Sequence, residues 1–241
     1  MQASPLISCL CISHDRVPLL RNAVENFFQQ TWPRRELIVL HEDRDVSTAA
    51  WLAALAHPAV RSLVVPALPH LSLGAKRNMA VAAAQGSHVA TWDDDDWHAP
   101  RRLERQMETL AASGAPACTL RRETVYDAAT HSAWLTQPRI WENTLVAEKA
   151  AMPPYPPLER GSDTVCVQAL TARGAVAWLD APELYIYHVH GRNVNSRGHF
   201  RRKIFNRAQA LNGDCADRLQ QLLSDPTRPA LTAEDLLLAP G

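Results

Sequence analysis

The sequence predicts an α/β fold, in which a mixed, Rossmann-like sheet carries helices on both faces. In the first half of the chain, short apolar runs alternate with amphipathic stretches one helix long, which is typical of parallel strands joined by helices. After residue 115 the runs become shorter and pair across polar turns, which indicates a smaller β and loop region. The chain has 241 residues, 46% hydrophobic and 21% charged, the composition of an ordinary folded protein.

Each element of the first half is predicted from a local signal. Four apolar runs predict strands at residues 6–13, 37–40, 60–65 and 88–92. Apolar residues at helical spacing predict helices at residues 18–30, 47–56, 74–85 and 100–112. Pro18 and Pro100 suit the first turns of two of these helices. Ser47 and Ser72 are expected to cap the other two, and Gly86 to leave the third helix in a left-handed conformation.

The second half is predicted to be less regular. Residues 117–127 and 132–135 are expected to form an antiparallel pair, and residues 152–157 (MPPYPP) a stiff loop. The remaining expected elements are a helix at 162–172, strands at 176–179 and 184–189, and a basic C-terminal helix at 199–223. The tail after Pro226 is expected to be a peripheral appendage.

Composition excludes several classes of protein. The 25 Lys and Arg residues balance 25 Asp and Glu residues, so we expect no nucleic-acid partner. Five scattered cysteines, an odd number, do not describe a disulfide framework and fit reduced thiols. No signal-peptide pattern opens the chain, and no apolar run approaches the ~20 residues that span a bilayer. We therefore expect a cytoplasmic protein without a transmembrane segment.

Acidic residues follow two of the predicted strands. Four consecutive aspartates, Asp93 to Asp96, come directly after the fourth strand, and Glu42 and Asp43 follow the second. Ligands of open α/β sheets bind at the carboxyl ends of the strands, so these acids are expected to line one crevice. Neighbouring carboxylates repel one another unless a cation lies among them, and hard oxygens suit Mg²⁺ or Mn²⁺. Because Mg²⁺ takes further oxygens from substrate phosphates, the run predicts a metal that bridges the protein and a diphosphate.

The alternative interpretation of the aspartates is a solvated turn ahead of a helix. Aspartate is common there because it caps the helix and complements its dipole. Asp96 in particular is a candidate cap for the helix that Pro100 opens.

A resemblance to family 2 glycosyltransferases, which have the GT-A fold, is carried by residues 72–106, SLGAKRNMAVAAAQGSHVATWDDDDWHAPRRLERQ. That family shows G-A-x-R-N, a strand, an aspartate-x-aspartate motif, a tryptophan and a proline-capped helix. Its opening strand, amphipathic helix, Q-T-x-P and second strand resemble residues 7–43, ISCLCISHDRVPLLRNAVENFFQQTWPRRELIVLHED. The sequence departs from the family's P-T-x-N at residues 12–15 and from its D-D-G-S at residues 41–44. The resemblance covers roughly residues 5–200.

The resemblance implies a nucleotide-diphospho-sugar donor, UDP-, GDP- or dTDP-linked, held together with Mn²⁺ or Mg²⁺. Carried over position by position, it makes Asp95 the expected metal ligand. The other matched residues are expected around the donor: Glu42 or Asp43 near the base, Lys76, Arg77 and Asn78 beside the nucleotide or its diphosphate, and Asp93 and Asp94 near the ribose and phosphates. For Lys76 and Arg77 the alternative is a solvated helix face.

The catalytic base is also implied by the resemblance. Residues 159–164 (ERGSDT) resemble the family's G-E-D segment, with Ser162 in place of the usual glutamate. Asp163 then matches the base that removes the proton of the acceptor hydroxyl, a role worth about 10²–10⁴-fold in rate. The alternative for Asp163 is an acid in the first turn of a helix that Ser162 caps. Glu159 is the second candidate for the base.

A histidine and a basic segment complete the predicted site. Residues 185–193 (YIYHVHGRN) resemble the family's strand that ends in H-G-x-N, and His190 matches the histidine beside the metal and diphosphate. Strand alternation places His188 on the same face, so His188 is the rival. No acid occurs from residue 184 to residue 213, which contain Arg192, Arg197, Arg201, Arg202, Lys203 and Arg207. This segment is interpreted as a lid over the diphosphate, a surface for anionic lipid or an anionic acceptor, or a solvated helix.

Together these inferences predict one GT-A domain at residues 1–213, with a nucleotide-sugar-binding half (1–115), an acceptor-binding half (116–213) and a C-terminal helical appendage (214–241). The predicted function is inverting, metal-dependent glycosyl transfer to a glycan, lipid-linked or protein acceptor, in the cytoplasm or peripherally at the inner face of the membrane. One alternative is a non-catalytic nucleotide-sugar-binding protein, which the departure at Ser162 favours. The other is a sugar-phosphate nucleotidyltransferase, although such enzymes carry G-x-G-x-R after strand one and residues 13–16 (SHDR) contain no glycine.

Overall fold

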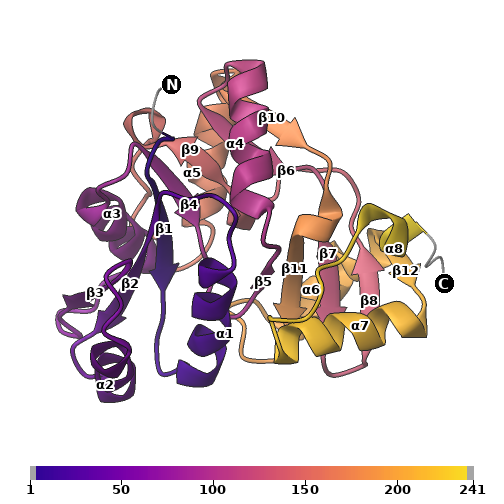
Figure 1. The fold of residues 1–241 in the computed structure, drawn as a ribbon, viewed down its shortest axis with the longest axis horizontal. Coiled ribbons are helices and arrows are strands. Elements are labelled where there is room, and N and C mark those ends of the chain that lie inside the picture. Colours follow the sequence, from indigo (N-terminus) through magenta and orange to yellow (C-terminus); the bar gives the residue numbers. More distant parts are fainter. Residues whose placement is uncertain (1–3, 238–241) are drawn as a thin grey trace.

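The computed structural model describes residues 4–237, which form two sheets, the first at the left and the second at the right of Figure 1. The first sheet has seven strands in the order β10-β6-β9-β4-β1-β2-β3. Strand β9 pairs antiparallel with β4 and β6, whereas the other pairs are parallel. The bounds of the strands are β1 Ile7–Ile12, β2 Arg35–Glu42, β3 Val60–Val65, β4 His88–Thr91, β6 Ala117–Leu120, β9 Val146–Glu148 and β10 Val176–Leu179. The mixed α/β sheet that the sequence predicts is confirmed.

Helices cover both faces of this sheet because its central strands are apolar on both sides. Cys9 and Cys11 point to one face, where they pack with Phe27 beneath three helices, α1 (Val17–Phe28), α2 (Val46–Leu55) and α4 (Arg102–Ser113). Leu10 points to the other face and packs with Ala80 of α3 (Leu73–Ala83), and α5 (Ser162–Ala172) covers the same face further along. All five cysteines are buried and free, as expected of packed thiols.

The second sheet has five strands in the order β12-β8-β7-β11-β5. Its strands are β5 Trp97–His98, β7 Thr124–Asp127, β8 Ser132–Leu135, β11 Tyr185–Val189 and β12 Gln209–Leu211. Since β4 belongs to the first sheet and β5 to the second, the four aspartates between them lie where the two sheets meet. The antiparallel pairing of β5 with β11 brings the chain around residue 98 next to residue 185.

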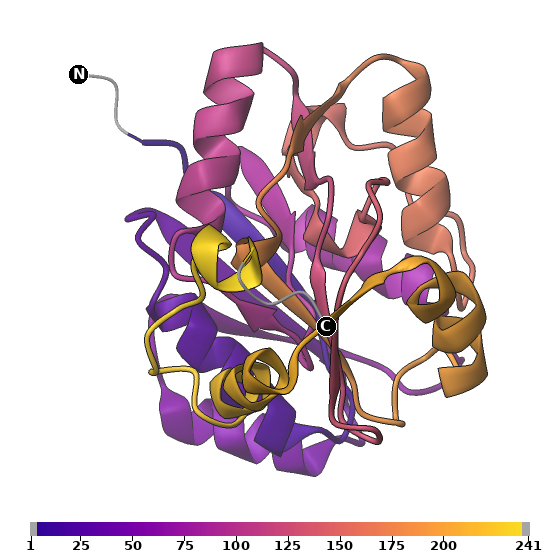
Figure 2. The same cartoon turned by 90° about the vertical axis from the view of Figure 1, so that its right-hand side faces the viewer.

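Helices also cover both faces of the second sheet. One face carries α7 (Gly213–Ser224) and α8 (Ala233–Leu237), and the other carries α6 (Arg197–Lys203). Leu231 and Leu236, which follow α7, are buried in the same core as Leu219 and Tyr185. The tail after Pro226 is therefore packed against this core in the described part of the chain, and its expected peripheral placement is wrong (Figure 2).

Four short 3₁₀ helices connect these elements, at Glu142–Thr144, Lys149–Ala151, Pro182–Leu184 and Phe205–Arg207. Within residues 4–237, the longest helices have 12 residues, and none has the length and apolarity needed to cross a bilayer.

Several boundaries differ from those predicted. The run at 117–127 is two strands in different sheets, and only its second part, β7, forms the expected antiparallel pair with β8. The basic helix expected at 199–223 is wrong, because α6 ends at Lys203, β12 follows, and Asn212 begins α7 by accepting a hydrogen bond from the Cys215 N–H. Strands β5, β9 and β12 were not predicted, since pieces of two or three residues carry no readable periodicity.

The predicted caps were partly right. Ser72 caps α3 by accepting from the Ala75 N–H at 3.3 Å, as expected. Helix α2 is capped by Asp45, whose Oδ1 accepts from the Thr48 N–H, and not by Ser47. Gly86 is not one of the described glycines with a positive φ, so the expected left-handed exit from the third helix is wrong. Glycine is required there by close packing, because a Cβ would lie 2.5 Å from the carbonyl oxygen of Leu6.

Candidate active site

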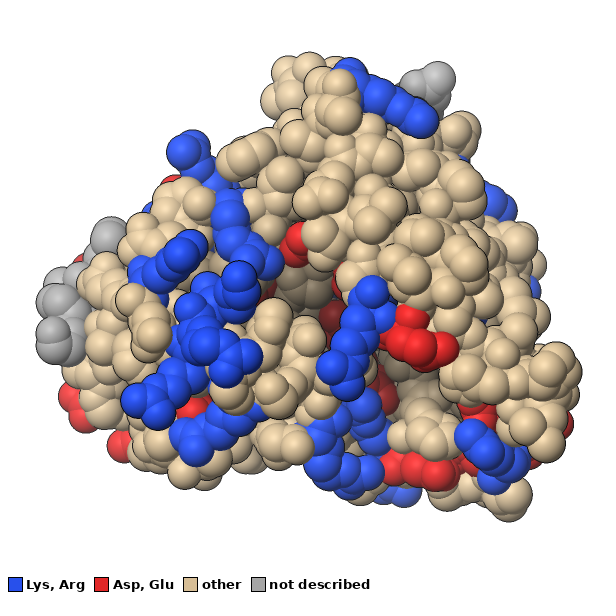
Figure 3. Space-filling view, turned by 180° about the vertical axis from the view of Figure 1, so that it is seen from behind, with Lys and Arg blue, Asp and Glu red and all other residues tan. Residues whose placement is uncertain are grey.

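A cleft of about 790 Å³ opens at the carboxyl ends of the first sheet's strands. Its lining comes from both halves of the chain. Ser13 after β1, Glu42 of β2 and Asp93 after β4 belong to the first half, and Asp163 of α5 and His199 of α6 belong to the second. Figure 3 shows this hollow on the face opposite to that of Figure 1, with acidic side chains inside it and Lys and Arg along its edges. This is the position at which α/β sheets bind their ligands.

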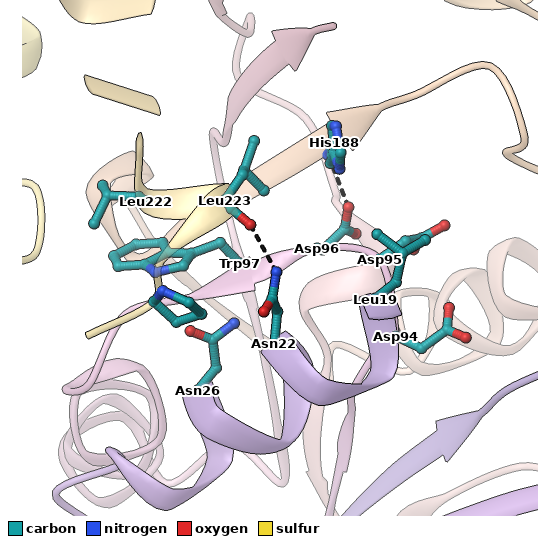
Figure 4. A pocket seen from close by; sticks show the side chains of 11 residues that line it. Leu19, Asn22, Asn26, Asp94, Asp95, Asp96, Trp97, His188, Leu222 and Leu223 are labelled. Carbon is teal, nitrogen blue, oxygen red and sulfur yellow. Dashed lines mark hydrogen bonds between the residues drawn. The ribbon is translucent and has the colours of Figure 1, made fainter. Parts of the chain in front are cut away.

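The four aspartates do not act as one charged surface, because two of them turn into the protein. Asp94 accepts hydrogen bonds from the Ser13 hydroxyl at 2.7 Å and from Arg16 Nη1 at 3.2 Å. Asp96 accepts from the Tyr185 hydroxyl and, at 2.8 Å, from the His188 N–H. Figure 4 shows Asp96 directed toward His188, away from Asp94 and Asp95. The cap of α4 is Arg101, so the alternative in which Asp96 caps that helix is wrong.

A second, much smaller cavity lies behind the aspartates and appears in Figure 4. Its volume is about 10 Å³, enough for one water, and it is lined in part by Asn26 and Trp97. Asn26 Oδ1 and Trp97 Nε1 have no hydrogen-bond partner within residues 4–237. An acceptor and a donor that face the same cavity suit a buried water, and the cavity is too small for a substrate.

Burial makes the inner aspartates weak acids. It raises the pKa of Asp93 to about 6 and that of Asp94 to about 7, and the neighbouring charge of Asp95 adds to both shifts. The pKa of Asp96 is raised well above its usual value by burial and then by Asp95. Beneath them lies the fully buried Arg102, whose positive charge acts against the shift of Asp93. In the protein alone, protonation therefore relieves part of the repulsion that a cation would otherwise relieve.

Asp95 and His190 converge on one point of the cleft. Asp95 Oδ2 lies 2.9 Å from His190 Nε2 and 2.8 Å from Arg16 Nη1. The side chain of His188, the rival, makes no hydrogen bond to the Asp95 carboxylate: its ring lies between those of His190 and Tyr126, at centroid distances of 5.0 and 6.0 Å, and burial lowers its pKa to about 4. Strand β11 ends at Val189, so the alternation of side chains along the strand does not fix the direction of the His190 side chain, which contacts Asp95.

A carboxylate and an imidazole at this spacing fit Mn²⁺ or Mg²⁺ as an incomplete ligand set. Within the described residues, no group of three or more His, Cys, Asp or Glu side chains is arranged to hold a metal by itself. Asp95 and His190 are the two side chains here that could hold a metal, with its other ligand positions left for a diphosphate or water.

Glu42 and Lys76 lie together at the expected base end of the cleft. Glu42 Oε1 accepts from Lys76 Nζ at 2.8 Å, and this hydrogen bond holds the pKa of Glu42 below its usual value. Asp43 is not part of the cleft lining, since its Oδ1 accepts from the backbone N–H of Ala67. Lys76 is therefore bound to an acid within the cleft and is not a solvated residue of the helix face.

Asn78 also lies outside the lining, where it fixes a loop. Its amide donates to the carbonyl oxygen of Tyr155 and accepts from the N–H of the same residue, both at 2.8 Å. This pair anchors the proline-rich loop that leads to α5. Gly74 permits the same approach, because a Cβ there would lie 1.8 Å from the carbonyl oxygen of Pro156.

Arg77 connects α3 to the predicted base. Its Nη1 donates to the Ser162 hydroxyl at 2.7 Å and its Nη2 to Asp163 Oδ2 at 3.1 Å. Ser162 does not cap α5; Gly161 occupies the cap position at φ 73°, and no side-chain cap bond is formed. Glu159, the second candidate, is exposed and lies 2.9 Å from His70 at the edge of the cleft. Asp163 lines the cleft and is oriented by Arg77, whereas Glu159 has no comparable support.

Sequence reasoning missed several residues of the site. Arg16 was not singled out, although its place directly after the first strand was a usable signal. Glu123 was also missed: it is fully buried, its Oε2 accepts from Asn143 of the cleft wall at 2.9 Å, and burial raises its pKa to about 8. Arg139 lies over the ring of Trp141 at 4.0 Å in the same wall. These contacts join segments that no local pattern relates.

Comparison with solved structures identifies the class of fold. The crystal structure of S. aureus TarS 1–349 in complex with UDP-GlcNAc is similar, with a TM-score of 0.60 at 12% identity, over 76% of this chain and 58% of that one. So is the mannosyltransferase PcManGT from Pyrobaculum calidifontis in complex with GDP-Man and Mn²⁺, with a TM-score of 0.59 at 16% identity, over 80% and 59% of the two chains. The protein has the fold of GT-A glycosyltransferases, as predicted.

The family follows from the sequence itself. Residues 8–168 match the sequence model of the family described as "Glycosyl transferase family 2". The chain therefore belongs to this family. A curated relative, the succinoglycan biosynthesis protein ExoO of Rhizobium meliloti (strain 1021), is 28% identical over 111 residues. That match spans 46% of this chain and 31% of ExoO, so this chain covers about a third of that relative's length.

Proposed function

We propose that this protein is a metal-dependent, inverting glycosyltransferase that moves a sugar from a nucleotide diphosphate donor to an acceptor hydroxyl. One observation carries the proposal: Asp95, which contacts His190, and Asp163, which contacts Arg77, line a single cleft at the carboxyl end of the sheet. Membership of glycosyl transferase family 2 supports the same reaction class.

The donor is expected to lie along the side of the cleft formed by the first half of the chain. Glu42 and Lys76 are placed to contact the base, and Asp93 to contact the ribose and phosphates. The solved relatives are complexes with UDP, UDP-GlcNAc and GDP-Man, and for this chain we retain UDP-, GDP- and dTDP-linked sugars as donors. Asp95 and His190 would hold the metal, which when bound supplies a Lewis acid to the leaving diphosphate.

Asp163 is assigned the base. Its carboxylate takes the proton of the acceptor hydroxyl as that oxygen bonds to the anomeric carbon, while the bond from this carbon to the diphosphate breaks on the opposite face. Arg77 holds the carboxylate at Oδ2, and the N–H of Thr164 donates to Oδ1, so the group is fixed in one orientation before the acceptor binds. Positioning of this kind reduces the entropy that the transition state must lose.

The assignment is tested with Asp95→Ala, Asp163→Asn and the control Asp180→Asn, a change at an exposed carboxylate paired with Arg122. Thermal shift measures binding of UDP, GDP or dTDP with and without Mn²⁺, and release of nucleoside diphosphate over an acceptor panel measures transfer. Wild type and the control should be stabilised only by nucleotide and Mn²⁺ together, a shift that Asp95→Ala abolishes. Asp163→Asn should keep the shift and lose about 10²-fold or more in transfer. Near-normal transfer by Asp163→Asn would remove the assigned base.

A non-catalytic nucleotide-sugar-binding protein is the second candidate. It is favoured by Ser162, which replaces the family's usual glutamate and whose hydroxyl accepts a hydrogen bond from Arg77. Donor binding with metal, but neither transfer nor donor hydrolysis over the whole panel, would establish it. Release of pyrophosphate from a nucleoside triphosphate would instead indicate nucleotidyl transfer. A cytoplasmic location and contact with the inner membrane face remain predictions.

A further inference from the structure

Two groups of cations in and beside the cleft differ in how they are paired. In the first group, Arg16 is paired with Asp95, Lys76 with Glu42, and Arg77 with Asp163. The second group, which we call the acceptor-side cation cluster, consists of three residues that line the cleft, Arg139, Arg160 and His199, and of Arg202 and Lys203 further along α6. Of its four permanently charged members, only Arg139 forms an ion pair within residues 4–237, with Glu142 at 3.4 Å.

Three separate segments bring this cluster together. Arg139 precedes the 3₁₀ helix at Glu142–Thr144, Arg160 lies in the loop before α5, and His199 is on α6, and all three side chains line the cleft. Arg160 stands three positions before Asp163, the assigned base. Three members of the cluster therefore line the same cleft as Asp163.

Helix α6 is anchored at the cleft, where His199, Phe200 and the following Ile204 form part of the lining. Phe200 and Ile204 are buried in the core of the second sheet, where Phe200 packs on Tyr187 at 5.3 Å. The side chain of Arg202 folds back along α6 toward Gly198. Its Nη1 lies 3.4 Å from the position that a Cβ on Gly198 would occupy. Burial is the main cause that lowers the pKa of His199, and the charges of Arg202, Lys203, Arg139 and Arg160 lower it further. The four cations therefore lie close enough to His199 to act on it together.

We propose that the acceptor carries a phosphate group close to its accepting hydroxyl and that the acceptor-side cation cluster binds this phosphate. The proposal rests on the proposed function and names the substrate class for it. Guanidinium groups donate two parallel hydrogen bonds to phosphate oxygens, and one phosphate neutralises more than one cation. The four permanently charged members are exposed, and a neutral acceptor would give them no anion to bind. The donor diphosphate is assigned to the part of the cleft where Arg16 and Lys76 are already balanced by acids.

The test compares a phosphorylated probe with its neutral counterpart. Calorimetry measures binding of α-glucose 1-phosphate and of methyl α-glucoside, with Mg²⁺ present and with or without UDP or GDP. Wild type should bind the phosphate, and the neutral sugar about tenfold more weakly or not at all. The variant Arg202→Gln/Lys203→Gln should weaken phosphate binding about tenfold and leave nucleoside diphosphate binding within about twofold. Arg160→Gln should give a loss of phosphate binding without changing α6.

The matched control is Arg201→Gln/Arg207→Gln, which removes two exposed cations of the same segment. Equal weakening by this control would show a diffuse basic surface and overturn the proposal. So would an equal loss of nucleoside diphosphate binding by Arg202→Gln/Lys203→Gln, since the cluster would then serve the donor. Vesicles of phosphatidylglycerol form a third arm, and vesicle binding without binding of the sugar phosphate would make this wall a membrane contact. If wild type binds the sugar phosphate but no nucleotide, the proposed function fails while the phosphate site stands.

Discussion

Glu123 is a buried carboxyl group, and its replacement by glutamine is expected to stabilise the protein increasingly as pH rises. Burial is the main cause that raises its pKa from 4.5 to about 8, and Oε1 has no partner within the described residues. Below pH ~4.5 both the folded and the unfolded states hold the proton, so the group contributes nothing to the pH dependence. Between the two pKa values the unfolded state releases its proton while the folded state keeps it. Unfolding then becomes easier by about 1.4 kcal/mol per pH unit.

The size of the effect follows from the interval between the pKa values of 4.5 and about 8. Glu123 lowers the free energy of unfolding by about 3 kcal/mol at pH ~7 and by about 5 kcal/mol above pH ~8, where the effect levels off. Glutamine reproduces the protonated group, since its carbonyl can accept from Asn143, and it removes the penalty. Urea unfolding of wild type and Glu123→Gln near pH ~5, ~7 and ~9 measures the difference, with Glu148→Gln at an exposed position as the control. Parallel stability curves, with a difference that does not grow with pH, would refute the reasoning.

Three further changes probe the framework of the site. Gly74→Ala places a methyl group on the carbonyl oxygen of Pro156, a backbone atom that cannot yield, and should cost about 1–3 kcal/mol or more; an unchanged melting temperature would contradict the packing. Arg77→Lys keeps the charge but cannot bridge two acceptors, so transfer should fall about 10–100-fold as Asp163 loses its orientation; steady-state rates within twofold of wild type would argue against this. Leu219→Ala in the core of the second sheet should cost about 2–5 kcal/mol in denaturant unfolding, and a negligible loss would show that α7 is not part of that core.

Elements with a long local pattern were predictable. The strands and helices of the first half lie close to their expected positions, since each carries several turns or residues of one periodicity. The basic helix at 199–223 was wrong for the opposite reason. Its composition is helical throughout, but Phe200 and Ile204 pack on one face of the second sheet and Leu219 on the other, so the chain must break between them.

The same distinction, between local sequence patterns and contacts of distant segments, applies to the site. The position of the aspartates at a strand end and the place of Asp163 in the first turn of α5 are local properties of the sequence. The partner that each aspartate binds is decided by distant segments, because Ser13 binds Asp94 across 81 positions and Tyr185 binds Asp96 across 89. Asp95 forms its contact with His190, a residue 95 positions away.

By itself, then, the sequence determined the order of the longer elements, the Ser72 cap of α3 and the chemistry available at the strand ends. Those properties arise from the spacing of apolar side chains and from hydrogen bonds between near neighbours. Only the tertiary structure decided which cations meet at the cleft and whether an acid pairs with each of them. Pairing depends on distances between segments far apart in sequence, and packing of the two sheets sets those distances.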